Sequence, residues 1–463
     1  MDATYLFARN ILGIKFEDLP SDVVDSTKKQ ILDFIGVALG GSSEPGVKEI
    51  ADLALEWGGA AQSSVMNWGY KLPTPNAAQL NATMAHSLDY DDVHETAVMH
   101  PGVVTVSTAL AMAEYIGGLS GREFIAAVAT GTDFICRLGL ATRPGQNIHA
   151  FGWHLTSLYG FMTAAAVAGR VLSLDEDRMV NAIGIAYHQS AGNGQCVQDG
   201  ALTKRMGPGM AVKGGITAAL MARNGVTGAK NCLEGVHGLY NVYHQGSYSQ
   251  SALTEDLGTR FEGVNVSIKP YPCCRGVHPF IDAALKIVNE HSIVADDVES
   301  ILIGCGEGTY GLLASPVEAK IKPRNFVDSQ FSVPWGVATS VARKRAAIDD
   351  FTDQAIHDKD ILDVAKKISV VVDPELDRAD VIEPARVRIN LKNGNSHFEQ
   401  VNLPTGTPSN PMTFEDCVRK FRDCITHAER QIPNSNADQV VELVSNLENV
   451  EDIQEVLALL VWE

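Results

Sequence analysis

Residues 86–101, with the sequence HSLDYDDVHETAVMHP, concentrate side chains that can take up or release protons. The stretch holds three histidines and four acidic residues within sixteen positions. Leu88, Val93 and Val98 lie between them, and this interleaving predicts partial burial rather than a solvated loop. Because burial and neighbouring charges shift the pKa values of carboxylates and imidazoles, such an arrangement is typical of an acid/base site.

The same stretch offers side chains that could bind a metal ion. Carboxylate and imidazole ligands are available at Asp89, Asp91, Asp92, His94 and His100. Their spacing matches neither the H-E-x-x-H motif nor the EF-hand loop. The sequence therefore predicts a site that works without a metal and without any other cofactor.

Two later stretches each place basic side chains beside an expected helix start. In FGWHLTSLYG, His154 has aromatic and small neighbours, a setting in which a lone histidine is more often structural than catalytic. In GALTKRMGPGMAVKGG, Lys204 and Arg205 come just before glycines and a helix. Two cations beside a helix N-terminus favour an anion site, and solvated bases in a loop are an equal alternative.

A fourth stretch, IKPYPCCRGVHPFIDAAL, combines cations, thiols and a histidine between prolines that stiffen the backbone. Arg275 could hold a carboxylate through two parallel hydrogen bonds. Cys273 or Cys274 could act as a nucleophile with His278, although adjacent cysteines are more often small packed hydrophobic side chains.

The glycines of GCGEGTYG match the G-x-G-x-x-G pattern of dinucleotide-binding loops. That pattern needs a helix directly after it and an acidic residue about 20 positions on. Here Pro316 interrupts the following segment and Phe331 stands at the acidic position. We interpret the match as chance, and the chain also has no Walker A and no G-x-S-x-G motif.

The elements that must position these side chains change in character along the chain. The first ~265 residues are expected to be mostly helical, with N-caps at Ser120 and Ser173 followed by glutamates three positions on. Ala- and Gly-rich runs at 160–172 and 211–225 predict helices that pack closely inside a bundle. Beyond 265, β-branched and alternating runs predict strands, including a hairpin at Asn393–Gly394.

The chain then returns to helix, with an N-cap at Thr413. This order predicts a mainly α protein. Its large all-α helical domain would comprise 1–265 together with the C-terminal helices 405–463, and a smaller α+β lid domain would be inserted at 266–404.

Charge and composition exclude several classes of partner. The 463 residues include 37 Lys+Arg and 56 Asp+Glu, a formal net charge of −19, which argues against nucleic acid and anionic membranes. A small anionic substrate needs only a local basic pocket. No signal peptide, no membrane span of ~20 apolar residues and no C-x-x-C motif is seen, so a reduced, cytoplasmic protein is expected.

Five stretches in chain order resemble the successive signatures of the MmgE/PrpD family, whose members include 2-methylcitrate dehydratase, cis-aconitate decarboxylase and iminodisuccinate epimerase. They are HSLDYDDVHETAVMHPG, GWHLTSLYG, LTKRMGPGMAVKGG, KPYPCCRGVHPFIDA and GTPSNPMTFEDCVRKF, and the similarity runs from about residue 5 to residue 460. The resemblance implies a homodimer whose subunits have a helical domain and a smaller lid. It also implies a metal-free active site between the two domains.

The resemblance also implies the site residues. Those matched to family positions are Asp89, His100, His154, Lys204, Lys269, His278 and the lid residue Tyr310. Val93 and Cys274 stand where the decarboxylase branch has a threonine and a catalytic histidine, which disfavours decarboxylation of cis-aconitate.

We therefore expect a cofactor-independent lyase that dehydrates a small hydroxy di- or tricarboxylic acid. The expected catalytic residues are Asp89, His100, His154, Lys204 and His278, and the expected substrate-binding residues are Lys269, Arg275, Tyr310 and Cys274. Removal of a proton beside a carboxylate builds negative charge that lysines and arginine can stabilise, and histidine can carry the proton near neutral pH. An epimerase or isomerase of a related acid is the main alternative, and an inactive binding or scaffold homologue is the non-enzymatic one.

Overall fold

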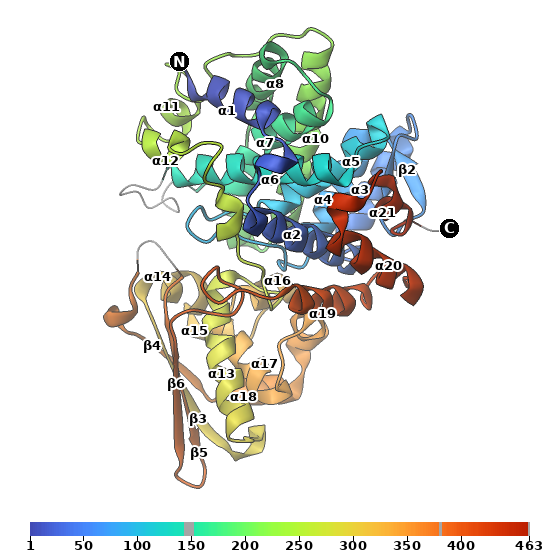
Figure 1. Cartoon of the computed structure of the whole chain (residues 1–463). Coiled ribbons are helices and arrows are strands. Elements are labelled where there is room, and N and C mark those ends of the chain that lie inside the picture. The colour runs from blue at the N-terminus through green and yellow to red at the C-terminus, as the bar shows by residue number, and fades with distance from the viewer. Residues whose placement is uncertain (143–151, 379–381, 462–463) are drawn as a thin grey trace. The chain divides into compact units, whose positions relative to one another are not determined.

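The computed structural model describes residues 1–142, 152–378 and 382–461, and most of these residues lie in helices (Figure 1). The chain forms two compact units. The first comprises Met1–Ser87, Asp91–Val266 and Thr413–Glu463, and the second comprises Leu88–Tyr90 and Ser267–Met412. The mainly α class predicted from the sequence is confirmed.

The first unit is built from helices, and its described strands β1 (Ser63–Val65) and β2 (Tyr70–Leu72) form one short antiparallel pair. The helices before residue 266 are α1 (Ala3–Gly13), α2 (Ser21–Gly40), α3 (Val47–Trp57), α4 (Thr74–His86), α5 (Gly102–Ile116), α6 (Gly121–Leu140), α7 (Leu155–Val171), α8 (Glu176–Gln189), α9 (Gln195–Asp199), α10 (Thr203–Arg223), α11 (Leu239–Tyr243) and α12 (Gln250–Thr254). The C-terminal helices are α19 (Phe414–Ile425), α20 (Asn434–Ser445) and α21 (Gln454–Ala458).

Helix α10 packs at close range against both α4 and α7 because small residues line its contacts. α7 is buried along its whole length. A Cβ added at Gly215 of α10 would lie 2.5 Å from the Ala164 Cβ of α7, and one added at Gly209 would lie 2.5 Å from the Gln79 carbonyl oxygen of α4. The close helix packing predicted from the Ala- and Gly-rich runs is therefore present. It holds the ends of these three helices at fixed positions relative to one another.

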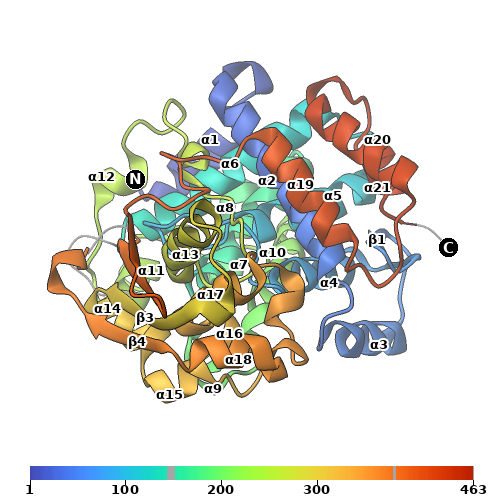
Figure 2. The same cartoon turned by 90° about the horizontal axis from the view of Figure 1, so that it is seen from below.

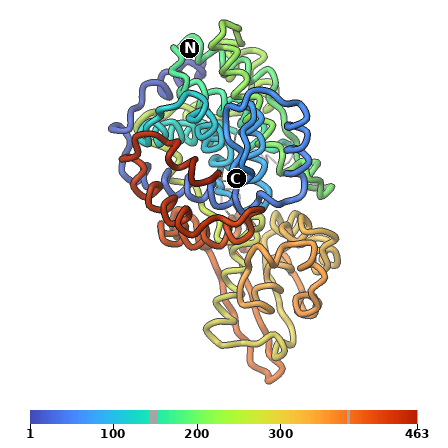
Figure 3. Tube along the Cα trace, turned by 90° about the vertical axis from the view of Figure 1, so that its right-hand side faces the viewer, coloured from blue at the N-terminus to red at the C-terminus, as the bar shows by residue number. Residues whose placement is uncertain are grey.

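The C-terminal segment returns to the first unit by packing α19 on α2 (Figures 2 and 3). A Cβ added at Gly40 of α2 would lie 2.9 Å from the Cys424 carbonyl oxygen of α19. Lys420 Nζ lies 2.5 Å from Asp33 Oδ1, and both side chains are almost completely buried. This pair places two opposite charges inside the helical core.

The helix N-caps read from the sequence are right in two of three cases. Ser120 accepts a hydrogen bond from the Glu123 N–H at the start of α6, and Thr413 forms a capping box with Asp416 at the start of α19. The prediction of Ser173 as an N-cap is wrong. Asp175 caps α8, because its carboxylate accepts a hydrogen bond from the Arg178 N–H.

The second unit is built on a four-stranded sheet in the order β4–β3–β5–β6. Its strands are β3 (Val298–Cys305), β4 (Ile368–Val372), β5 (Ala385–Leu391) and β6 (Ser396–Val401). β4 runs parallel to β3, whereas β5 is antiparallel to both β3 and β6. The predicted hairpin is confirmed, because Gly394 adopts a positive φ of 87° in the turn between β5 and β6.

Helices cover one face of this sheet. The helices that contact the strands are α13 (His278–Glu290), α15 (Val317–Ile321) and α17 (Val333–Arg343), with α13 lying along the sheet in Figure 1. The unit also contains α14 (Glu307–Thr309), α16 (Phe326–Gln330) and α18 (Lys359–Ala365). Alternate residues of β5 point inward, and Trp335 of α17 is fully buried with its indole N–H donated to the Asp350 carbonyl oxygen at 3.0 Å. The second unit therefore has a hydrophobic core of its own.

In the described part of the chain, no helix combines the length and the apolar character needed to cross a membrane.

Candidate active site

Three helices of the first unit bring polar side chains together at their ends. α4 ends at His86, His154 is the N-cap residue of α7, and Lys204 is the second residue of α10. The ring centroids of His86 and His154 lie 5.8 Å apart. A Cβ added at Gly207 would lie 2.3 Å from Ser157 Oγ and 3.7 Å from His154 Nδ1. Since residues three apart share a helix face, Lys204 lies on the face of α10 that carries Gly207.

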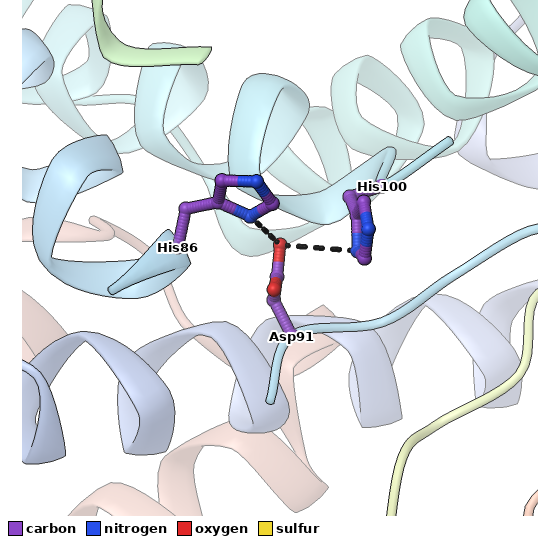
Figure 4. A group of neighbouring side chains, drawn as sticks. All are labelled: His86, Asp91 and His100. Atoms are coloured by element: carbon purple, nitrogen blue, oxygen red, sulfur yellow. Dashed lines mark hydrogen bonds and ion pairs between the residues drawn. The ribbon is translucent and has the colours of Figure 1, made fainter. Parts of the chain in front are cut away.

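The Asp91 carboxylate joins two of the histidines in this cluster (Figure 4). Asp91 Oδ2 lies 2.7 Å from His86 Nδ1 and 3.4 Å from His100 Nδ1. The His86 and His100 rings meet edge to face, with centroids 4.8 Å apart. The side chains of His86 and Asp91 are almost completely buried, and that of His100 is 14% exposed. Of the three side chains, His100 is the most open to solvent.

The hydrogen bonds of His100 define its tautomer. His100 Nδ1 lies 2.7 Å from the main-chain oxygen of Asp92. A carbonyl oxygen can only accept, so Nδ1 carries the proton of this hydrogen bond. In the neutral ring the other nitrogen, Nε2, is then the basic one. This arrangement is typical of a general base: the hydrogen bond of Nδ1 fixes the orientation of the ring, and Nε2 can take up a proton.

The loop that carries His100 is tied to the start of α7. The His100 N–H donates to Thr156 Oγ1 at 3.0 Å, and His154 Nδ1 lies 2.7 Å from Ser157 Oγ. These contacts hold His100 and His154 on neighbouring backbone segments. His100 and His154, which the sequence predicted as catalytic, therefore lie close to one another in the first unit. Lys204, the third predicted residue, lies in the first turn of α10, the helix that packs on α7.

The Asp92 carboxylate caps a helix. Its carboxylate accepts the Gly102 N–H at the start of α5 through both oxygens, at 3.0 and 3.2 Å. Burial raises the pKa of Asp92 well above its usual range, and the nearby charges of Asp33 and Asp91 raise it further. Gly102 is required here because a Cβ would lie 2.7 Å from Asp92 Oδ2.

His94 stabilises the turn of the same loop. Its Nδ1 accepts the Ala97 N–H at 3.1 Å, and its Nε2 lies 3.6 Å from a carboxylate oxygen of Glu262. The contact with His94 is the main reason that the pKa of Glu262 falls to about 2. His94 is therefore occupied by a structural role.

Ligand atoms of His86, Asp91 and His100 all lie within 4.8 Å of one another, close enough for a metal ion. A metal bound by Nδ1 of His100 would have to replace the proton that this nitrogen donates to the Asp92 carbonyl oxygen. The hydrogen bonds thus fit a proton-carrying cluster better than a set of metal ligands.

The second unit holds Asp89 and Lys269 as a buried ion pair. Lys269 Nζ donates to the Asp89 main-chain oxygen at 2.7 Å and lies 3.1 Å from its carboxylate. Asp89 has a positive φ of 51°. The short segment Leu88–Tyr90 is also held by Gln330, which donates to the Leu88 oxygen at 2.8 Å, and by Tyr90 OH, which donates to the Pro270 oxygen at 3.0 Å.

Arg275 and His278 form a second polar group in this unit. Arg275 Nη1 lies 3.0 Å from His278 Nδ1 and donates to the Thr405 oxygen at 2.8 Å. Because guanidinium only donates, Nδ1 of His278 accepts and its Nε2 donates to the Cys273 oxygen at 3.2 Å. Burial first, and then Arg275 and Lys269, lower the pKa of His278 well below its usual range. This arrangement favours a positioning role for His278 over the proton transfer that the sequence suggested.

The other predicted residues of the second unit lie close to its hydrophobic core. Cys273 is fully buried, and burial raises the pKa of its thiol, so it is unsuited to act as a thiolate nucleophile. Cys274 is partly buried, and its N–H donates to the Gln330 oxygen at 2.9 Å. Tyr310, in the π-helical turn Tyr310–Ala314, packs against the core from its edge.

The glycine-rich loop after β3 is filled by the chain's own carboxylates. Asp377 accepts the Glu307 N–H at 2.7 Å, and Glu383 accepts the Thr309 N–H at 3.1 Å. A Cβ added at Gly306 would lie 2.6 Å from oxygens of both acids. These N–H groups would face the phosphates in a dinucleotide site, so the interpretation of the motif as a chance match agrees with the structure.

Comparison with known families decides what kind of protein this is. The model of the MmgE/PrpD N-terminal domain matches residues 6–251, and that of the MmgE/PrpD C-terminal domain matches residues 271–449. The chain belongs to the MmgE/PrpD family.

Several relatives in this family carry an activity in their names. A cis-aconitate decarboxylase from Aspergillus terreus is 26% identical over 96% of this chain and 93% of its own length. The mouse cis-aconitate decarboxylase is 25% identical over 97% of this chain and 91% of its own, and a cis-aconitate decarboxylase-like protein from Aspergillus oryzae is 25% identical over 98% and 96%. The likeness to these MmgE/PrpD proteins thus extends over almost the whole chain.

Two residues of the first-unit cluster were not among those predicted from the sequence. Both lie in the stretch 86–101, where the sequence offered Asp91 only as a possible metal ligand and gave His86 no role. The signal was available, because a histidine at a helix end five residues before an acid can reach it across a turn. Only the structure shows that Asp91 contacts His86 and His100.

Proposed function

We propose that this MmgE/PrpD protein is a cofactor-independent lyase that dehydrates a small hydroxy di- or tricarboxylic acid. The observation that carries the proposal is the tautomer of His100, whose Nδ1 donates to the Asp92 oxygen, so that Nε2 is the basic nitrogen of the neutral ring. The relatives from Aspergillus terreus and mouse are named cis-aconitate decarboxylases, and they support an enzyme of lyase type.

In the proposed reaction, His100 Nε2 removes a proton from the carbon next to a substrate carboxylate. The electron pair left behind spreads into that carboxylate, and the ammonium of Lys204 stabilises the growing charge. The pair then forms the new double bond as the β-hydroxyl leaves, taking a proton from His154 to form water. His100 ends with one extra proton and His154 with one fewer, and exchange with water restores both.

We also propose, on the family resemblance, that Arg275 and Lys269 assist in binding substrate carboxylates. Arg275 offers a planar set of donors, of which Nη1 is engaged by Thr405 and His278. Lys269 is already paired with Asp89, so its contribution is expected to come through the position of the Leu88–Tyr90 segment.

Two other reactions share the same anionic intermediate. Return of the proton to the opposite face would give an epimerase. Loss of carbon dioxide would give a decarboxylase, the activity named for the relatives, but Val93 and Cys274 replace the threonine and histidine of that branch.

A substrate screen tests the proposal. The purified protein is incubated with C4 to C7 hydroxy- and imino-polycarboxylates and with cis-aconitate. Absorbance of a new double bond is followed, together with carbon dioxide release and proton exchange by NMR in D2O. A new double bond with loss of water supports the proposal. Exchange without net reaction indicates an epimerase, carbon dioxide indicates a decarboxylase, and no reaction with any acid favours a binding homologue.

A further inference from the structure

The contact of one carboxylate with two histidines is a feature that the proposed reaction does not yet use. Asp91 Oδ2 faces Nδ1 of both His86 and His100, at 2.7 and 3.4 Å. Its other oxygen, Oδ1, is buried and has no hydrogen-bond partner among the described residues. Among the described residues, the hydrogen-bond and ion-pair partners of the Asp91 carboxylate are therefore the two imidazoles.

We propose that His86 and Asp91 are positioning residues that act through His100, with His86 anchoring the Asp91 carboxylate so that it faces His100 Nδ1. This inference rests on the proposed function, because it assigns His100 as the base. When His100 takes the substrate proton at Nε2, its ring becomes positively charged. The Asp91 carboxylate then lies beside the N–H that bears part of this charge and stabilises it.

The burial of the cluster gives this arrangement its strength. The side chains of His86 and Asp91 are 0% and 2% exposed, so little water screens the attraction between Asp91 and a protonated His100. The groups around His100 are His86 from α4, Asp91 and Asp92 from its own loop, and His154 from α7. Further charges come from the Asp33–Lys420 pair of α2 and α19, which acts on Asp92.

Two substitutions of His86 separate positioning from proton transfer. The amide nitrogen of asparagine occupies nearly the place of histidine Nδ1, whereas that of glutamine occupies nearly the place of Nε2. His86→Asn thus keeps a donor for Asp91 and removes the ring, and His86→Gln lacks a donor at the Nδ1 position. Neither variant can transfer protons as an imidazole does.

Steady-state kinetics use the substrate found in the screen. The value of kcat should depend on whether residue 86 still donates a hydrogen bond to Asp91. We expect kcat of His86→Asn within about threefold of the parent protein, and kcat of His86→Gln lower by about tenfold or more, with little change in KM. Equal and large losses in both variants would overturn the positioning role by making the imidazole itself a proton carrier. Equal retention in both would also overturn it. Thermal unfolding of both variants checks that they fold alike.

Histidine titration by NMR tests the inference without any substrate. In Asp91→Asn the negative charge beside His100 is lost, so the protonated ring is less stabilised and the pKa of His100 should fall by about 1 unit or more. His100→Asn identifies the His100 resonance by its absence. An unchanged His100 titration in a folded Asp91→Asn protein would overturn the inference. If the screen finds no substrate but this titration shifts, the proposed function fails and the coupling stands.

Discussion

His100 and His278 are the same residue type, but their hydrogen-bond partners differ, and the partners determine which proton transfers each ring could perform. His100 has one ring nitrogen bound to a main-chain oxygen, and its other nitrogen can accept a proton. His278 accepts from Arg275 at Nδ1 and donates to Cys273 at Nε2, so both nitrogens are engaged, and its pKa is lowered by burial. Residue type alone would assign them the same role.

A matched pair of variants tests this contrast. His100→Asn keeps a donor for the Asp92 oxygen but removes the base, so kcat should fall by about 10²-fold or more. His278→Asn places an amide oxygen where Nδ1 accepted from Arg275, so kcat should stay within about tenfold. Steady-state kinetics on folded variants measures both. A loss in His278→Asn as large as in His100→Asn would return His278 to a catalytic role.

His244 gives a prediction for the dependence of stability on pH. It lies 2.8 Å from Tyr159 OH, and burial lowers its pKa from 6.5 to about 4. Below about pH 6.5 the unfolded chain therefore binds a proton that the folded chain does not. The contribution of neutral His244 to the free energy of unfolding is complete at pH 7 and declines as the pH falls toward 4.

The variant His244→Gln removes this titration. Between pH 7 and pH 5 the parent protein should lose about 1–2 kcal/mol more of its free energy of unfolding than the variant does. Urea unfolding at the two pH values measures the difference. Parallel losses in both proteins would show that His244 does not titrate in this range on unfolding.

At the scale of elements, helix ends place the cluster. α4 ends at His86, α7 begins after His154, and α10 begins one residue before Lys204. Close packing between the helices fixes these ends relative to one another. The glycines of α10 therefore help to position the site, because they allow α10 to pack closely on α4 and α7.

Gly209→Ala tests this dependence. Its Cβ would meet the Gln79 carbonyl oxygen at 2.5 Å, and main-chain atoms cannot move aside cheaply. We expect a loss of about 1–3 kcal/mol in stability and reduced activity. Gly13→Ala in α1 is the control, because no atom lies within 4 Å of its added Cβ, and it should be neutral or slightly stabilising. Thermal unfolding compares the two, and similar melting temperatures would contradict close packing at α10.

At the scale of the whole molecule, the reaction is expected to need no metal. The His86–Asp91–His100 cluster has the dimensions to accept one, so the expectation is open to a direct test. Activity should survive prolonged EDTA treatment, and metal analysis of the treated, active protein should find less than one tenth of an equivalent of zinc, iron or magnesium per chain. Loss of activity that one of these metals restores would make the cluster a metal site.

We also propose that the protein is a homodimer, as the family resemblance implies. Light scattering coupled to size-exclusion chromatography should give twice the mass of one chain across a range of concentrations. A mass equal to one chain at all concentrations would contradict this. The net charge of −19 favours repulsion between copies, so the measurement belongs at physiological salt, where charges are screened.

The sequence by itself determined the class of fold and the segments that carry chemistry. Small residues at 160–172 and 211–225 fixed the packed helices, and local turn chemistry fixed the caps at Ser120 and Thr413 and the hairpin at Asn393–Gly394. These features depend on interactions within a few residues, or on periodic patterns that one chain segment displays alone. The prediction of His100, His154 and Lys204 as catalytic has the same basis, since they are reactive residue types in distinctive local stretches.

Only the tertiary structure decided which hydrogen-bond and ion-pair partners those residues have. Asp89 and Asp91 are two positions apart and chemically identical, yet the first pairs with Lys269 and the second joins His86 to His100. Which nitrogen of His100 holds the proton depends on one carbonyl oxygen, and that contact exists because the loop folds back on itself. Hydrogen-bond partners, burial and tautomer depend on how the backbone turns and on contacts between distant segments. Spacing could suggest that His86 reaches Asp91, but it could not show that Asp91 also contacts His100 or which nitrogen of His100 carries the proton.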